Sequence, residues 1–241
     1  MKFFSSTKFL TVYSGILTAV FAVVVLCGAS IMRNQTFGVI TARRINIVEP
    51  DGTVRLTISN RADFPGAWNR KKEYPRPDRQ EAAGMLFMSE EGTEQGGLIW
   101  GASQLPDGTI ENHGHLSLDQ YEENQVFAID AGQEGSDKFS RITMADQGDF
   151  PIVEKRQAND EIRKLPASQQ DAAWNKFFAN HRHDVKRLVL GRSPDGSVGL
   201  SLRDGAGRVR IVLAVQPDGE PLLQFLNDKG KVIREFVAKE K

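Results

Sequence analysis

The sequence predicts a mainly β protein, an antiparallel meander of repeated hairpins with a two-helix insertion, preceded by one transmembrane helix. The tripeptide Pro-Asp-Gly begins at residues 50, 106, 194 and 217, each time between short runs of alternating apolar residues. Proline presets φ for a type I turn, aspartate accepts a backbone hydrogen bond, and glycine takes the left-handed conformation that closes a hairpin. A second observation, an uncharged stretch over residues 9–32, predicts the membrane helix.

Composition excludes several classes of function. The 241 residues are 40% hydrophobic and 26% charged, as in folded proteins, and 31 basic side chains balance 31 acidic ones. Without a net positive field, we expect no nucleic-acid partner. The sequence has no Gly-x-Ser-x-Gly elbow, no glycine-rich phosphate loop and no His-Glu-x-x-His motif. We therefore assign no catalytic residue and expect no cofactor.

The N-terminus is expected to comprise a short basic tail (1–8), a transmembrane helix (9–32) and a juxtamembrane segment (33–44). The apolar segment is long enough for a bilayer core of about 30 Å. A cleaved signal peptide is the competing interpretation, because Lys2 and Lys8 precede the segment and small residues end it, but the segment exceeds the usual apolar length of such signals. The membrane is thus the first predicted partner.

The orientation of the chain in the membrane is predicted from the order of its N-terminal segments rather than from their charges. Lys2 and Lys8 are nearly matched by Arg33, Arg43 and Arg44 on the other side of the apolar segment. A short basic tail followed by an apolar segment is typical of a signal-anchor, which favours an extracytoplasmic, periplasmic location for the rest of the chain. The single cysteine lies in the apolar segment, so the remaining domain (45–241) has no disulfide.

The first hairpin is predicted over residues 45–49 and 54–59, which alternate around the first Pro-Asp-Gly. A long proline-rich and basic loop (60–82) follows it without periodicity. Such a loop is functional, a packed Ω-type loop or disordered. On the functional interpretation it binds a sugar or peptide through two aromatic side chains with a basic rim: Trp68, Tyr74, Arg70, Lys71 and Lys72.

The remaining elements continue the meander. Strand patterns occupy residues 84–88, 97–101, 109–119, 125–130 and 140–144. A helical insertion is predicted over residues 151–183, where Trp174, Phe177 and Phe178 recur at helical spacing and Ser168 precedes Asp171 as in a capping box. Strands then return at 198–202, 209–215, 222–226 and 232–236. The first and later Pro-Asp-Gly hairpins resemble each other, and the pattern leaves a sandwich, a barrel and an open sheet as alternatives.

The strand over residues 112–120 carries the sharpest candidate for chemistry. Alternation places His113, His115, Ser117 and Asp119 on one face. Two histidines at i and i+2 lie about 7 Å apart and can converge on a metal ion with a carboxylate, in this case Asp119. The motif resembles the His-x-His of cupin barrels, without their second half-motif. The alternative is the solvated outer face of a half-buried strand.

Several longer stretches of the sequence resemble a group of other proteins. INIVEPDGTVRLTISN, the Phe64-Pro65-Gly66 and Glu73-Tyr74-Pro75 of the loop, AGMLFMSEEGTEQGGLIWG and GHLSLDQYEENQ are similar to a group of uncharacterised bacterial membrane-anchored proteins with a short N-terminal span. The resemblance implies a bacterial origin and a place in the bacterial cell membrane, and it carries over no activity.

Together these features predict a membrane-anchored extracytoplasmic binding or scaffolding module. Antiparallel repeats leave edge strands, so a protein partner or a homo-oligomer could pair at an edge. The alternative function is a hydrolase or metal-binding enzyme that uses the face of His113, His115 and Asp119.

Overall fold

In the computed structural model, the described residues are 7–30, 36–79 and 81–237. They divide into two compact units, Met1–Ala42 and Arg43–Lys241. The first contains the helix α1 (Thr7–Ser30). Over Thr7–Leu26 this helix is long and apolar enough to span a membrane, criteria that a signal sequence also meets. The predicted span continues to residue 32, and residues 1–6 and 31–35 lie outside the described part.

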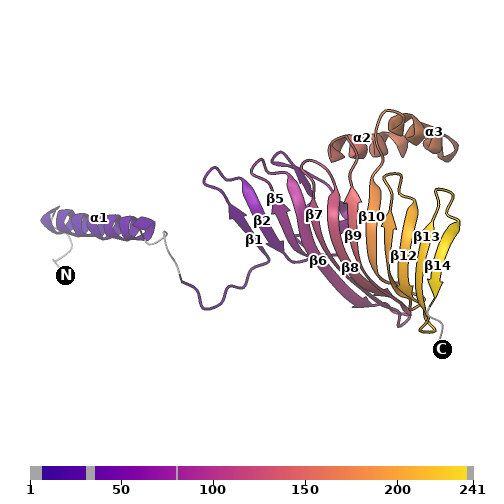
Figure 1. The fold of residues 1–241 in the computed structure, drawn as a ribbon. Coiled ribbons are helices and arrows are strands. Elements are labelled where there is room, and N and C mark those ends of the chain that lie inside the picture. Colours follow the sequence, from indigo (N-terminus) through magenta and orange to yellow (C-terminus); the bar gives the residue numbers. More distant parts are fainter. Residues whose placement is uncertain (1–6, 31–35, 80, 238–241) are drawn as a thin grey trace. The chain divides into compact units, whose positions relative to one another are not determined.

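The second unit is built on one antiparallel sheet, in which the described chain places twelve strands (Figure 1). We call it the main sheet. Its strands lie in chain order except that β3 and β4 form a separate two-stranded ribbon. The main-sheet strands are β1 (Arg44–Val48), β2 (Val54–Ser59), β5 (Ala83–Met88), β6 (Glu94–Gln104), β7 (Ile110–Asp119), β8 (Gln125–Glu134), β9 (Asp137–Asp146), β10 (Val185–Arg192), β11 (Val198–Arg203), β12 (Val209–Val215), β13 (Pro221–Leu226) and β14 (Val232–Val237).

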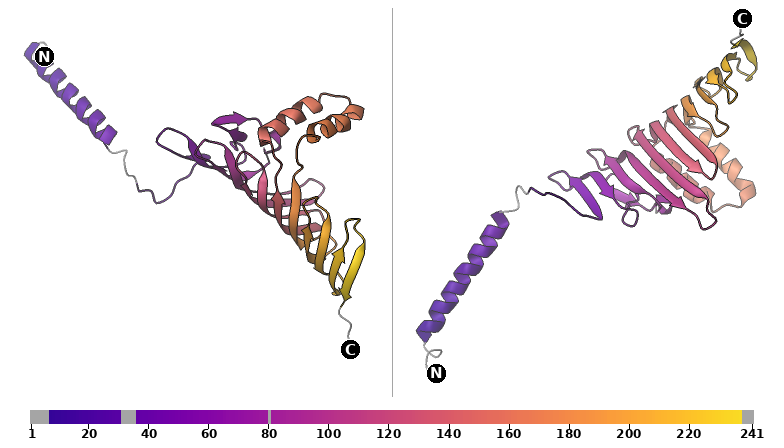
Figure 2. Two further views of the ribbon diagram at one scale, coloured as in Figure 1. Left: turned by 45° about the horizontal axis from the view of Figure 1, so that its top comes forward. Right: turned by 90° about the horizontal axis from the view of Figure 1, so that it is seen from below.

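The predicted fold class is confirmed, and the open sheet is the correct alternative. The main sheet begins at β1 and ends at β14, and the pairing order does not join these two strands. The sheet therefore does not close into a barrel, and it twists steadily from one edge to the other (Figure 2).

The four Pro-Asp-Gly turns share one geometry. The glycines have φ of +84°, +89°, +92° and +93°. In each turn the aspartate Oδ1 accepts a hydrogen bond from the backbone N–H two residues later, at 2.9 to 3.1 Å. Each turn residue thus performs the role that its chemistry predicts.

The helical insertion consists of α2 (Ile152–Ile162) and α3 (Ala167–Phe178) between β9 and β10, and both lie on one side of the main sheet (Figures 1 and 2). Phe150 is 2% exposed, and its ring packs edge-on against Phe177 and Phe178. The predicted capping box is not formed, because Pro166 occupies the N-cap of α3 without a side-chain hydrogen bond.

The segment predicted as a loop (60–82) is a packed structure. It forms the ribbon of β3 (Ala67–Asn69) and β4 (Lys72–Tyr74) and the short 3₁₀ helix η2 (Pro77–Arg79). Pro65 and Ala67 are fully buried. Arg79 anchors the segment to β6 through a two-pronged ion pair with Glu94, in which both side chains are nearly buried. The segment covers part of one face of the main sheet.

Burial alternates accordingly along the strands beneath this cover. Thr57 and Ser59 of β2, Leu86 of β5, Ser117 of β7 and Ala128 of β8 are buried, and the pairing register puts all five on one face. We call it the covered face. The neighbouring residues on these strands, which point the other way, are not buried. The core of the domain is therefore one-sided.

Candidate functional site

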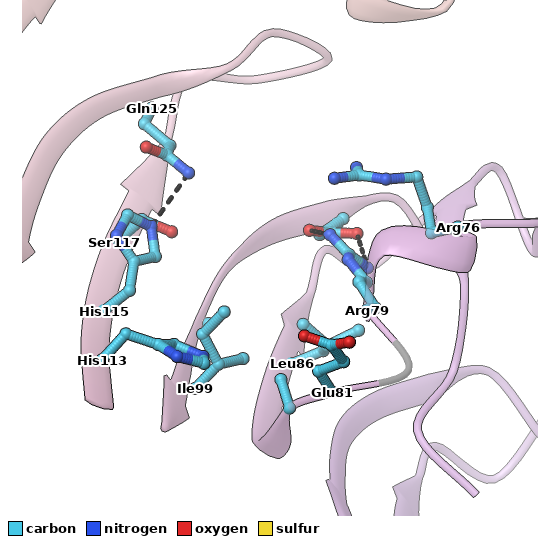
Figure 3. Close-up of a pocket in the computed structure, with 12 residues that line it drawn as sticks. Arg76, Arg79, Glu81, Leu86, Ile99, His113, His115, Ser117 and Gln125 are labelled. Atoms are coloured by element: carbon cyan, nitrogen blue, oxygen red, sulfur yellow. Dashed lines mark hydrogen bonds and ion pairs between the residues drawn. The ribbon is translucent and has the colours of Figure 1, made fainter. Parts of the chain in front are cut away.

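The covered face bears a pocket at β5–β8 under the 3₁₀ helix. Its volume is about 290 Å³ (Figure 3). We call it the histidine pocket. Strand residues form one side of it, and Arg76, Arg79, Glu81 and Ala82 form the other, so the two sides come from different segments of the chain. Its lining residues include Arg76, Arg79, Glu94, His113, His115, Ser117 and Gln125.

His115 is fixed by hydrogen bonds on both ring nitrogens. Nδ1 lies 2.7 Å from Asp130 Oδ1, and Nε2 lies 3.0 Å from the Gln125 amide nitrogen. Because an amide NH₂ only donates, Nε2 accepts and Nδ1 carries the proton that it donates to Asp130. Burial opposes ionisation of Asp130, but hydrogen bonds from His115 and Arg141 bring its pKa below the ordinary value. The imidazole ring is thus held in one orientation.

His113 has a more open position. A Cβ atom at Gly101, its partner on β6, would lie 2.7 Å from His113 Cε1 and 3.2 Å from the Glu81 carbonyl oxygen. A side chain at position 101 would therefore displace the imidazole and crowd the Glu81 carbonyl. Figure 3 shows His113 on the same side of the pocket as His115.

Asp119 follows a bulge after Leu118. Its Oδ1 is buried and has no hydrogen-bond partner among the described residues. Burial, with the Glu94 carboxylate nearby, raises the pKa of Asp119 to about 7, although Arg79 and Arg156 oppose this increase. Asp119 is consequently protonated or poised to be protonated near neutral pH.

The predicted metal site requires several side chains that converge on one ion. Among the described residues, no three His, Cys, Asp or Glu side chains converge so that they could hold a metal ion. His115 uses both ring nitrogens on protein groups instead. A nucleophile relay is also not assembled, because Ser117 makes no hydrogen bond to His115 within the described chain.

A second cavity, of about 730 Å³, lies between the loop segment and α2. We call it the arginine cleft. Its lining residues include Tyr74, Arg76, Arg156, Asn159, Asp160 and Arg163. Arg76 also lines the histidine pocket, so this residue borders both cavities.

The five loop residues predicted to bind a ligand are placed in different ways. Tyr74 lines the arginine cleft, and the Lys72 ammonium lies 5.0 Å from its ring centre. Arg70 pairs with Glu122 at 2.6 Å and Lys71 with Asp51 at 2.8 Å, so both cations hold the ribbon against neighbouring turns. Trp68 is half-buried, and its indole N–H is buried without a partner in the described part of the chain.

Sequence reasoning missed the arginines of the cleft. Arg156 lies on α2, and Arg163, seven residues or about two helical turns later, is the C-cap of that helix. Seven residues bring two side chains to one helix face, which was an available signal. Their proximity to Arg76, from a segment about 80 residues earlier, depends on tertiary packing alone. Neither a scan against protein-family models nor a search of curated proteins gave a match for this chain.

Proposed function

We propose that this chain is a single-pass membrane protein whose β domain lies outside the cytoplasm and binds a ligand with an anionic group in the arginine cleft. The observation that carries the proposal is the convergence of Arg76, Arg156 and Arg163 on one cavity. Among the described residues, neither Arg156 nor Arg163 has an ion pair or hydrogen bond within the protein that would occupy its guanidinium.

Arg156 gives the strongest support. Burial lowers the pKa of its guanidinium, even though the carboxylates of Glu94 and Asp119 lie near enough to oppose that change. A cation that is removed from water without a bonded partner destabilises the fold. An anion bound in the cleft would compensate for that desolvation, and planar guanidinium groups suit the paired oxygens of a carboxylate or phosphate.

The neighbouring side chains favour a polar ligand. Tyr74 and Asn159 supply a hydroxyl and an amide, and Asp160 supplies the one acidic group among the named lining residues. Cavities that bind small molecules combine a few oriented polar groups with apolar walls, and the prolines at 75 and 77 provide apolar surface here.

The anchored, extracytoplasmic arrangement is supported by α1 and by the order of a basic tail and an apolar segment at the N-terminus. The bacterial membrane location is supported by the resemblance described above. A hydrolase that uses the histidine pocket is the less favoured alternative, because Gln125 occupies His115 Nε2 and the described chain presents no bonded nucleophile.

The proposal is tested by calorimetric titration of the full chain in detergent micelles with inorganic phosphate and, separately, with a tricarboxylate. Arg156→Gln should abolish the binding of whichever anion binds to the native chain. Arg61→Gln is the matched control, because Arg61 is an exposed arginine of the same loop segment that is absent from the cleft lining. Absence of anion binding, or equal binding by native chain and Arg156→Gln, would contradict the proposal.

A further inference from the structure

The main sheet carries an apolar row on the face opposite the covered face. The pairing register aligns one residue from each of the twelve strands of the described sheet, and every one of them is apolar. None of them is buried. The row consists of Ile45, Ile58, Met85, Leu98, Leu116, Ile129, Ile142, Leu190, Leu200, Leu213, Leu223 and Phe236.

A second row runs beside the first. The register aligns it from β1 to β13, with Gly96 on β6 as the one position without a side chain, and its apolar members are Ile47, Leu56, Phe87, Leu118, Phe127, Met144, Leu188, Leu202, Ile211 and Phe225. We call the surface formed by both rows the bare face. Leu118 and Met144 are 49% and 45% exposed, and in the first row Leu213 and Phe236 are 52% and 53% exposed.

This distribution differs from the usual one, although the covered face also buries Leu86 and Ala128. An antiparallel sheet with one wet face normally buries its apolar side. Here the covered face buries hydroxyl groups of Thr57, Ser59 and Ser117, whereas the bare face exposes leucine, isoleucine and phenylalanine. Among the described residues from 163 onward, no side chain is buried, so β10–β14 have no core of their own within the chain. A sheet of this composition needs a cover.

We propose that a second copy of this chain covers the bare face and that two copies pack sheet against sheet. Twelve strands at about 4.8 Å spacing make a row about 55 Å long, and a surface two rows wide then buries roughly 800 Å² per copy, the size of a stable interface. Face-to-face packing of aligned sheets is the common way in which such surfaces become buried.

The twist favours another sheet over a bilayer surface. Neighbouring strands of a sheet differ in direction by roughly 20°, and Figure 2 shows that the main sheet twists along its length. A flat lipid surface meets only part of such a face. A second copy has the same twist and can follow the row along its length. Anchoring in one membrane would raise the effective concentration of the copies further.

Cross-linking of the full chain in phosphatidylcholine vesicles tests the proposal. In a Cys27→Ser background, single cysteines replace Leu98, Ile129 or Leu200 on the bare face, and Thr143 or Ser201 on the opposite face of β9 and β11. A short bismaleimide should shift the main band from monomer to dimer for cysteines on the bare face and leave Thr143→Cys and Ser201→Cys monomeric. Raising the lipid-to-protein ratio controls for collisions.

A substitution that should disrupt the dimer and a measurement of lipid contact complete the test. Leu213→Glu, added to Leu200→Cys, should abolish the dimer band, whereas Ala214→Glu, its neighbour on the other face, should preserve it. Trp100 lies on the bare face beside the row and is 47% exposed, so brominated lipid should not quench its fluorescence. Dimer bands from both faces, no band from any bare-face cysteine, or quenching of Trp100 without cross-linking would each overturn the proposal.

Discussion

At the scale of single residues, two acidic groups of the β domain are held in environments that disfavour their charge. Burial raises the pKa of Asp119 to about 7, with Glu94 adding to the effect. Glu123 also has a pKa of about 7, first from burial and then from the nearby carboxylates of Asp184 and Asp149. Between pH 4 and pH 7, both acids are therefore largely protonated in the folded chain and largely ionised in the unfolded chain.

This difference fixes the sign of a pH dependence. Where the folded state binds more protons, the free energy of unfolding falls as pH rises. The Asp119 contribution is thus complete near pH 4 and lost by pH 7, and a pKa increase of this size corresponds to at most about 4 kcal/mol. Asp119→Asn should flatten the decline in stability across this range, as measured by denaturant unfolding at several pH values. Asp218→Asn, in an exposed turn, is the control, and an unchanged slope for Asp119→Asn would contradict the assignment.

A second prediction at this scale concerns the stability of variants in the turn between β3 and β4. Arg70 and Lys71 have φ of +46° and +65°, the left-handed conformation that a type I′ turn requires and that glycine accepts without strain. Lys71→Gly relieves that strain, and Lys71→Ala does not, while both remove the exposed ion pair with Asp51. We expect the glycine variant to be more stable than the alanine variant by about 1 kcal/mol. Equal midpoints of denaturant unfolding would refute this.

Single residues on one strand were predictable, and their tertiary neighbours were not. Alternation correctly placed His113, His115 and Ser117 on one face, because the period of a strand is fixed by its backbone. The Asp130 partner of His115 required knowledge of the register between β7 and β8, and Arg76 came to the pocket from a separate segment. Neither relation leaves a local signal.

At the scale of elements, the segment over residues 60–82 is held in place by polar contacts. The backbone N–H of Arg70 donates to Thr93 Oγ1 and that of Lys71 to the Gly92 carbonyl. Arg79 donates to the Gly66 carbonyl as well as to Glu94. The sequence predicted no strands here because β3 and β4 are three residues long and flanked by prolines, too short for a visible period.

The Arg79–Glu94 pair is expected to control whether this segment stays closed. Removal of one partner from a nearly buried ion pair costs about 3 kcal/mol, since the other charge is left without compensation. In Arg79→Gln, hydrogen exchange at the Arg70 and Lys71 amides should therefore accelerate by about 100-fold, while β7 and β8 keep their protection. Arg61→Gln should leave exchange at these amides unchanged. Equal protection in native chain and Arg79→Gln would show that the pair does not hold the segment.

At the scale of the whole β domain, the meander gives each strand contacts mainly with its two neighbours in sequence. The turn chemistry and apolar alternation predicted this order of elements, because every local signal agrees with the final pairing. Which face would be covered was not predictable: both faces of β7 include residues compatible with burial, and the cover comes from residues 60–82 and 151–183. The resulting core lies under β2–β8, and β10–β14 form a single layer.

This asymmetry predicts uneven stability within one chain. A sheet whose strands contact only their neighbours behaves as a nearly one-dimensional array, in which local stability follows local burial. In detergent, at concentrations where the full chain is monomeric, amide exchange measured by mass spectrometry should be slowest in β5–β8 and faster throughout β10–β14. In vesicles, where the bare face is expected to be covered by a second copy, protection of β10–β14 should rise while that of β5–β8 changes little. Uniform exchange across all strands in the monomeric state would mean that the sheet unfolds as one cooperative unit, and the single-layer strands would then need no further cover.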